Sequence, residues 1–418
     1  MDVRAILNAN EARLRALYGG ELPAARYEAL TDAFRARFSR EPEAFVSAPG
    51  RTEVIGNHTD HNLGRVLAAA VHLDTLAAVA PVEGNTVTLW SEGYDKPFVV
   101  DLADLSVHEE EKETTFSLIR GVAARLSQLG YRIGGFDACV TSTVFKGSGL
   151  SSSAAFEVML VAIFDALYNG WTVDPKLNAQ ISKYAENVYF GKPSGLMDQM
   201  ASSVGGLVTI DFLPDDPDVR ALQYDFMGKG YAVCVVTVGG DHGDLTGEYA
   251  AITTEMRAVS QALERRVLAE TSAQELTDAL PHLKNRVPDR ALLRAFHFVD
   301  ETQRVVDAVE ALERDDIDSF FAALIASGES SWKLLQNLYV PASSNQEMPL
   351  ALEMSDRMLR GKGAWRIHGG GFAGTILAFM PFEMLELYRE RMDAVFGKGA
   401  TVPLSIRPEG AVVIRQEN

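Results

Sequence analysis

The chain has 418 residues, a formal net charge of −18 and 47% hydrophobic residues. This length can bury a large core and predicts two domains, while the acidic balance argues against nucleic acid and anionic membrane surfaces as partners. The two cysteines, Cys139 and Cys234, each lie in an apolar run, which is typical of reduced thiols in a cytosol. The N-terminal stretch lacks the apolar core of a signal peptide, and the longest apolar runs are too short to span a bilayer. We therefore expect a cytoplasmic globular protein.

In chain order, residues 1–18 and 22–38 are predicted to form two surface helices, followed by a short strand over residues 45–48. The next stretch, SAPGRTEVIGNHTDHNLGRVLAAAV (47–71), places a dense polar cluster between apolar segments. Such a cluster suits a loop that hydrogen-bonds a hydroxyl-rich ligand. Two alternatives are a metal site built on His58-x-Asp60-His61 and a simple turn held by Asx and Thr side chains.

Residues 71–107 alternate apolar and polar side chains, which predicts antiparallel strands. A helix over 114–129 and a strand over 135–145 follow. They lead to the stretch around which the chain is organised, KGSGLSSSAAFEVMLVAIFDALYNG (146–170). Glycines and three serines precede a helix that is apolar on most faces, so the helix should be buried and its N-terminus should be a phosphate site. The stretch is not a Walker A loop, because no G-x-x-x-x-G-K-[ST] occurs in the chain.

Two acidic residues follow this helix in unusual places. A further helix begins at Asp174-Pro175 and carries Glu186 in its last turn, where the helix dipole disfavours a carboxylate, so a metal ion or a salt bridge is expected there. Asp198 lies in the first turn of a short helix between glycine turns, a position that keeps a carboxylate ionised, although simple helix capping is the alternative. The Pro/Asp-rich segment 213–218 is a plausible domain boundary, which gives domains over 1–215 and 216–418.

The second half of the chain contains a buried strand over 231–238 and a helix that carries Tyr249. Near the end, WRIHGGGFAGTILAFM (365–380) formally contains G-x-G-x-x-G. A dinucleotide-binding fingerprint requires a helix after the glycines, but here a β-prone run follows and stops at Pro381, so we reject that interpretation.

Three stretches, APGRTEVIGNHTDHN, KGSGLSSSAA and HGGGFAG, resemble the three motifs of the GHMP-type small-molecule kinases, in the same order. The first is similar to the galactokinase signature, whose usual form is GRVNLIGEHTDYN, and G-x-M-D-Q at 195–199 is also galactokinase-like. The resemblance covers about residues 45–381. It implies an α+β, two-domain GHMP kinase fold with mixed sheets packed with helices and an active site between the domains.

The resemblance also implies roles for individual residues. Asp198 would be the catalytic carboxylate with Arg51 beside it, and Glu186 would bind Mg²⁺ together with Ser153. The sugar pocket would be lined by Asn57, His58, Asp60, Gly195 and Tyr249. ATP phosphates would be held by Gly147, Ser148, Gly149, Leu150, Ser151, Ser152 and Ser153. The site would be closed by Gly369, Gly370, Gly371 and Phe372.

The chain departs from the signature at Asn57, where the family usually has Glu, and at His61, where Tyr is common. The phosphate and base positions are intact, so we expect an ATP- and Mg²⁺-dependent kinase for the anomeric hydroxyl of galactose. The alternatives are a kinase for a related sugar (N-acetylgalactosamine, arabinose or a uronic acid) and a non-catalytic sugar sensor on the same fold. We expect a monomer or weak dimer.

Overall fold

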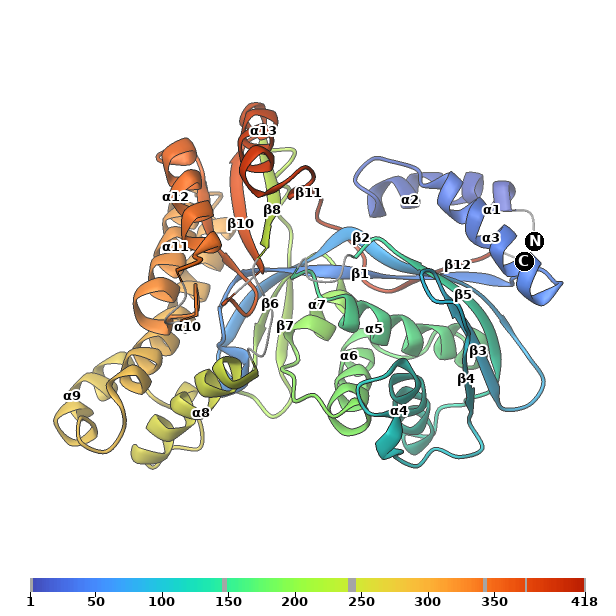
Figure 1. Cartoon of the computed structure of the whole chain (residues 1–418), viewed down its shortest axis with the longest axis horizontal. Helices are drawn as coiled ribbons and strands as arrows, with labels where there is room; N and C mark the ends of the chain where they lie inside the picture. The colour runs from blue at the N-terminus through green and yellow to red at the C-terminus, as the bar shows by residue number, and fades with distance from the viewer. Residues whose placement is uncertain (1–2, 145–148, 240–245, 341–343, 373, 417–418) are drawn as a thin grey trace.

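The computed structural model describes residues 3–144, 149–239, 246–340, 344–372 and 374–416, and it contains two sheets (Figure 1). In the described part of the chain, the first sheet has eight strands in the order β12-β1-β2-β5-β3-β4, with β6 paired to β2 and β7 to β6. The second has four strands in the order β11-β8-β10-β9. The strands of the first sheet are β1 (Ala44–Ile55), β2 (Arg65–Pro81), β3 (Thr86–Ser91), β4 (Phe98–Asp101), β5 (Phe136–Ser142), β6 (Leu207–Asp211), β7 (Asp218–Leu222) and β12 (Val412–Ile414). Those of the second sheet are β8 (Tyr231–Gly239), β9 (Ala364–His368), β10 (Gly374–Pro381) and β11 (Thr401–Leu404).

Helices cover both sheets. In Figure 1 the N-terminal helices lie above the first sheet, and four further helices, α4 to α7, lie below it. The N-terminal group is α1 (Val3–Ala9), α2 (Glu11–Leu17) and α3 (Ala24–Phe38). The group below comprises α4 (Thr115–Gln128), α5 (Ser152–Phe164), α6 (Pro175–Tyr184) and α7 (Met197–Val204). The remaining helices are α8 (Thr246–Ala262), α9 (Ala273–Leu283), α10 (Asp289–Glu313), α11 (Ile317–Ser330), α12 (Glu347–Leu359) and α13 (Leu385–Phe396). Helices α11, α12 and α13 pack against the second sheet, α10 packs against β1 and β2, and α8 and α9 pack against α10.

The predicted central helix is confirmed as α5, which continues into a π-helical turn, η3 (Asp165–Asn169). Ten of its thirteen residues are buried, on all faces of the helix. Within the described residues, the stretch Ser152–Asn169 is long and apolar enough to cross a membrane by length and composition alone, but 67% of it is buried inside the protein. It is the core helix of the first sheet's lower layer (Figure 1).

The expected strand over 45–48 is too short. β1 extends to Ile55 and every one of its twelve residues is buried. It passes through Pro49 because the register with β2 shifts between Pro49 and Arg51, and such a bulge accommodates a residue without an N–H. The first half of the polar stretch is therefore strand, and the loop proper begins after Ile55.

The predicted domains, 1–215 and 216–418, remain a prediction, and the strand pairing is relevant to them because the chain crosses between the two sheets more than once. β7 lies beyond residue 215 but pairs with β6, and β12 returns from the C-terminal half to pair with β1. We propose that the N-terminal domain comprises residues up to Leu222 together with the β12 segment. A Pro/Asp-rich composition marks a turn, but pairing of distant strands decides which domain a segment joins.

The N-terminal helices are more than a surface layer, because they hold a buried carboxylate of the sheet. The side chain of Asp74 in β2 is fully buried and accepts hydrogen bonds from Tyr18 (2.6 Å), Ser47 and Arg26. Arg407, from the C-terminal segment, lies 3.6 Å away. Burial alone would raise the pKa of Asp74, but the two guanidinium groups and the hydroxyl donors hold it below its ordinary value.

We predict that Asp74→Asn destabilises the fold by about 3–5 kcal/mol, because it leaves two guanidinium groups without their buried counter-charge. Urea unfolding at neutral pH measures the loss. The matched control is Glu409→Gln, which breaks a pair with Arg13 that is 42% exposed on both sides and should cost less than about 1 kcal/mol. Since the folded-state pKa of Asp74 is depressed, its contribution is present near neutral pH and is lost as the pH falls through that pKa. Equal losses in the two variants would contradict this account.

Candidate active site

The site is organised around an ion pair between β1 and α7. Arg51 Nε lies 2.7 Å from Asp198 Oδ1, and Arg51 Nη1 donates to the carbonyl of Gly149 in the loop before α5. Ser151 donates from Oγ to the other carboxylate oxygen of Asp198 at 2.6 Å. The first strand, the glycine-serine loop and the first turn of α7 therefore meet at one carboxylate.

The carboxylate of Asp198 is ionised and partly open. Burial would raise its pKa, but the charge of Arg51 and the hydrogen bonds from Arg51 and Ser151 hold the pKa below its usual range. About a third of the side chain (32%) remains exposed. It does not cap the helix: Leu196 is the N-cap residue of α7, and no side chain caps that end. The alternative interpretation of Asp198 as a simple helix cap is therefore wrong.

Ser151 is the N-cap residue of α5, but its side chain does not cap the helix. Its backbone is left-handed (φ 58°), and its hydroxyl donates to Asp198 while no side chain caps α5. Among the described residues, no side chain caps the backbone N–H groups at the start of α5, which is the arrangement in which a helix terminus receives an anion. Ser152 and Ser153 form the first turn of α5. The predicted phosphate-loop residues Gly147 and Ser148 lie outside the described residues.

Asp60 approaches the same region through a glycine. A Cβ built on Gly195 would lie 1.6 Å from Asp60 Oδ2, so a side chain at residue 195 is incompatible with this position of the carboxylate. Gly195 lies three residues before Asp198 and one before the N-cap of α7. The two predicted sugar-pocket residues are thus brought together, and the glycine is required for the close approach.

His58 meets the glycine turn of the third motif. Its backbone is left-handed (φ 57°), and Nε2 lies 2.8 Å from the carbonyl of Gly370. Burial lowers the pKa of His58 to about 4, so the ring is neutral near pH 7 and Nε2 carries the proton that the carbonyl accepts. Nδ1 is then an acceptor, and no hydrogen bond to it is found among the described residues. This arrangement disfavours the alternative of a metal site at His58-x-Asp60-His61, and no cluster of three metal-ligating side chains occurs in the described residues.

Tyr249 of α8 holds the other side of this turn. Its hydroxyl donates to the carbonyl of Gly371 (2.8 Å), and its ring packs edge-on against Phe372 with centroids 5.4 Å apart. The glycine turn Gly369 to Phe372 is therefore held from both halves of the chain.

Asn57, predicted to line the sugar pocket, is completely buried. Its side chain contacts Glu53, the carbonyl of Gly369 and the amide of Asn337. In the described structure it therefore faces protein groups.

Sequence reasoning missed two buried residues beside the ion pair. Glu53 pairs with Arg366 at 2.9 Å; burial raises the pKa of Glu53, and the charge of Arg366 opposes that effect. His368 accepts at Nε2 from the Glu53 amide (3.2 Å) and contacts Thr375 through Nδ1 (3.0 Å). Burial, together with Arg51 and Arg366, lowers its pKa well below 6.5, so it is neutral. Their signals were weak: Glu53 stands where the signature has Asn, and His368 directly precedes the glycine run.

Glu186 is buried and lies in a π-helical turn, η4 (Ala185–Phe190), that continues α6. It pairs with Lys192 (3.0 Å) and accepts from the amide of Gln199 (2.8 Å), which also donates to Glu157 (3.1 Å). Burial and the charge of Glu186 raise the pKa of Glu157 well above its ordinary value. The salt bridge expected as one explanation of this acid is therefore present, and the metal alternative remains a prediction.

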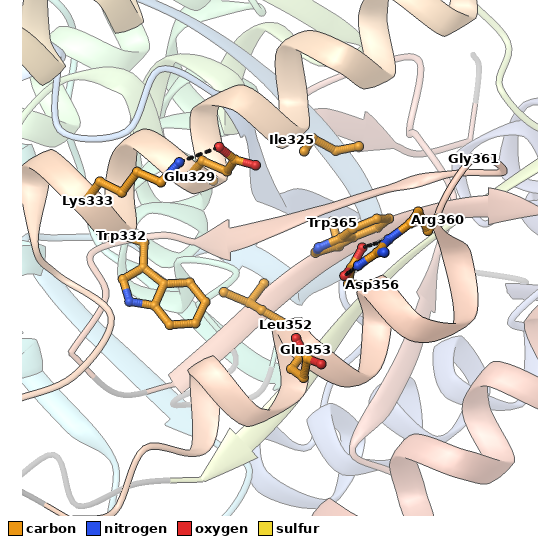
Figure 2. A pocket seen from close by; sticks show the side chains of 11 residues that line it. Ile325, Glu329, Trp332, Lys333, Leu352, Glu353, Asp356, Arg360, Gly361 and Trp365 are labelled. Atoms are coloured by element: carbon orange, nitrogen blue, oxygen red, sulfur yellow. Dashed lines mark hydrogen bonds and ion pairs between the residues drawn. The ribbon is translucent and has the colours of Figure 1, made fainter.

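A surface pocket of about 630 Å³ lies elsewhere, between α11, α12 and β9. Figure 2 shows Trp332 and Trp365 at its sides, with Lys333 paired to Glu329 and Arg360 paired to Asp356. None of the predicted site residues lines it. The pocket is therefore separate from the candidate active site, and Lys333 and Arg360 in its lining form ion pairs with residues four positions earlier in the chain.

Comparison with known proteins agrees with this geometry. The "GHMP kinases N terminal domain" model matches residues 117–206, and the "Galactokinase galactose-binding signature" model matches residues 32–81. Among solved structures, galactokinase from Lactococcus lactis in complex with galactose superimposes with a TM-score of 0.80 at 23% identity, covering 92% of this chain and 99% of the other. A mevalonate kinase gives a TM-score of 0.62 at 13% identity, covering 87% and 99%. The fold and its motifs are those of a GHMP kinase, and the expected fold class is confirmed.

Two curated relatives narrow this class. Galactokinase of Streptomyces coelicolor is 31% identical over 373 residues, which covers 87% of this chain and 92% of the relative. Galactokinase of Pyrococcus furiosus is 30% identical over 341 residues, covering 80% and 88%. The chain belongs to the galactokinase family.

We predict that the His58 imidazole stays neutral down to about pH 5, since burial lowers its pKa to about 4. NMR titration of the ring signals, assigned by comparison with His58→Gln, measures this. Because the unfolded chain binds the proton more readily, His58 should lower stability as the pH falls below about 6.5. A midpoint near 6.5 for this ring would show that the ring is not buried in solution as it is in the structure, because burial is what lowers its pKa.

Proposed function

We propose that the protein transfers the γ-phosphate of ATP to the anomeric hydroxyl of galactose. The observation that carries the proposal is the ionised, partly exposed Asp198, held by Arg51 and Ser151 directly beside the glycine-serine loop. Membership of the galactokinase family supports the reaction, and the Lactococcus lactis relative was solved with galactose. An intact ion pair between β1 and α7 favours a catalyst over a sugar sensor.

Asp198 would orient the sugar hydroxyl and receive its proton as the new O–P bond forms and the bond to ADP breaks. Because Arg51 and Ser151 stabilise the charged form, Asp198 is a weak base. Proton transfer should therefore follow the movement of the phosphoryl group, in keeping with a reaction that depends mainly on positioning and charge.

The sugar would lie against Asp60, Gly195, His58 and Tyr249. Asp60 accepts hydrogen bonds, Gly195 allows its approach, and the neutral His58 offers an acceptor at Nδ1. A set rich in acceptors suits a ligand rich in hydroxyl donors, and it rejects analogues that lack them.

ATP phosphates would bind at the N-terminus of α5, in the loop from Gly147 to Ser153. The positive end of the helix dipole and the N–H groups there favour an anion in a chain of net charge −18. The turn Gly369 to Phe372, held by His58 and Tyr249, would close the site.

Mg²⁺ would be held by Glu186 and the hydroxyl of Ser153, with the ATP phosphates as further ligands. The donors fit, because Mg²⁺ prefers one or two carboxylates plus phosphate oxygens. Glu157 Oε1 and Gln199 Oε1 are also buried oxygens without a hydrogen-bond partner among the described residues. Lys192, which now pairs with Glu186, is 58% exposed and can move aside. The ion would neutralise charge on the transferring phosphate.

The direct test is ADP release with MgATP and a panel of galactose, N-acetylgalactosamine, arabinose, glucose and glucuronic acid. Galactose should give the highest kcat/KM, and phosphorus NMR should locate the phosphate on the anomeric oxygen. A protein that binds galactose in calorimetry but releases no ADP would be a sensor, and the proposal would be wrong.

We predict that Asp198→Asn lowers kcat by at least about 100-fold while ATP binding persists, because the charge is lost and the shape is kept. Arg51→Lys should also be damaging, since it loses the planar fork. If the two residues serve one step, the double variant is little worse than the worse single variant. Asp211→Asn, which breaks the Arg65–Asp211 pair outside the site, is the matched control. Fully multiplicative losses would argue against the pairing.

We predict that Glu186→Gln raises the Mg²⁺ concentration needed for half-maximal turnover and lowers kcat, while galactose binding in calorimetry is kept. The matched control is Asp211→Asn, which breaks the Arg65–Asp211 pair outside the site and should leave the Mg²⁺ dependence unchanged. Unchanged Mg²⁺ dependence in Glu186→Gln would remove the metal assignment and leave the salt bridge with Lys192 as its role.

A further inference from the structure

Asn57 has no polar atom left for a substrate. Its Nδ2 donates to Glu53 Oε1 (3.0 Å) and to the carbonyl of Gly369 (2.7 Å). Its Oδ1 accepts from Asn337 (2.9 Å) and Ser331 (3.3 Å). The amide therefore uses its two donors and its acceptor oxygen within the protein, and the residue is fully buried.

The backbone of Asn57 is fixed as well. Its N–H donates to Glu301 (3.2 Å), and its carbonyl accepts from Nε2 of His297 (2.9 Å). Both partners lie on α10, so the loop cannot turn Asn57 toward a ligand without breaking contacts with that helix.

Beside Asn57, the negative charge of Glu53 is balanced by the positive charge of Arg366. Glu53 Oε1 accepts from Asn57 and from Arg366, whose side chain is 1% exposed. A second carboxylate at residue 57 would face that of Glu53 in a buried space and would leave the Gly369 carbonyl without its donor.

The galactokinase signature, GRVNLIGEHTDYN, has Asn and Glu at the positions of Glu53 and Asn57. In this chain the amide and the carboxylate have exchanged places. The exchange keeps one amide and one carboxylate in the pair, and the amide still donates to the carboxylate at 3.0 Å. The departure at residue 57 is thus accompanied by a compensating one at residue 53.

The exchanged pair, Glu53 and Asn57, fixes the glycine turn relative to the loop after β1 that carries His58. Asn57 binds the carbonyl of Gly369, and the next residue, His58, binds that of Gly370. Asn337 donates both to Asn57 and to the Gly370 carbonyl (3.1 Å). Displacing Asn57 would therefore move His58 and the turn together.

We propose that Asn57 and Glu53 form a positioning pair that sets His58 and the Gly369–Gly370 turn at the sugar site, and that Asn57 does not contact the sugar. This inference rests on the proposed function for its kinetic consequence, and on the contacts above for the pair itself. It replaces the expectation that Asn57 is a sugar ligand.

The test is a double-mutant cycle of Asn57→Glu, Glu53→Asn and the exchange variant that carries both substitutions. Each single substitution should lower kcat/KM for the sugar at least about tenfold, because it unbalances a buried, charged hydrogen bond. The exchange variant should recover at least about tenfold relative to Asn57→Glu. KM for ATP should change by less than about twofold, and the order of the sugars in the panel should stay the same.

Two further variants serve as controls outside the cycle. Asn57→Ala adds no charge and keeps the Glu53–Arg366 pair, so it should fold and raise KM for the sugar while the sugar order is kept. Ser331→Ala removes only the 3.3 Å contact and should change kcat/KM by less than about threefold. If Asn57 touched the sugar, Asn57→Ala and Asn57→Glu would reorder the panel and Glu53→Asn would not; that result overturns the proposal. So does a fully multiplicative cycle.

Thermal unfolding of the unsubstituted protein, Asn57→Glu, Glu53→Asn and the exchange variant tests this inference separately from the proposed kinase function. If the unsubstituted protein phosphorylates no sugar, the proposed function fails. The pair is still tested, because the exchange variant should then unfold at a higher temperature than either single variant. Additive shifts in unfolding temperature would show that Asn57 and Glu53 are not coupled.

Discussion

A buried carboxylate of α10 fixes the loop on which the site is built. Glu301 accepts from the backbone N–H groups of Gly56 (3.0 Å) and Asn57 (3.2 Å), and also from Ser327 and Arg304. Burial would raise its pKa, but His297, Arg366 and Arg304 hold the pKa at about 2. Because a buried carboxylate with four donors has little freedom to move, the end of β1 is tied to a helix about 245 residues further along the chain.

The family resemblance predicts that Arg51, Asp60, Gly195 and Asp198 share one site, and the structure brings Arg51 beside Asp198 and Asp60 beside Gly195. Gly195 and Asp198 lie close together in sequence, and Arg51, His58 and Asp60 fall within ten residues. The helix after the serines could be predicted from an uninterrupted run of apolar helix formers, and α5 agrees with it. Short-range neighbours suffice to predict the helix, whereas the contact between Arg51 and Asp198, which are 147 residues apart, was expected only from the resemblance to the family.

What the sequence could not show depends on distant partners. The polar residues in the second half of β1 indicate a loop in the sequence. In the structure this segment is a buried strand, because it pairs with β2 and contacts Arg366 and His368. The return of β12 to the first sheet follows from a hydrophobic edge that only the folded sheet presents. The hydrogen-bond partners of Asn57 could not be predicted for the same reason, because they include a residue 312 positions away.

The described carboxyl groups also show how environment sorts one chemical group into different tasks. Glu301, with four donors, is held ionised and structural, whereas Glu157 accepts from a single amide and has its pKa raised. Asp198 lies between these two: Arg51 and Ser151 keep it charged, but a third of it stays exposed. A carboxylate with every lone pair engaged has no acceptor left for a substrate, and a buried carboxyl group whose pKa is raised holds its own proton more readily. The partial satisfaction of Asp198 is therefore the property that suits it to accept a hydrogen bond from an incoming hydroxyl group.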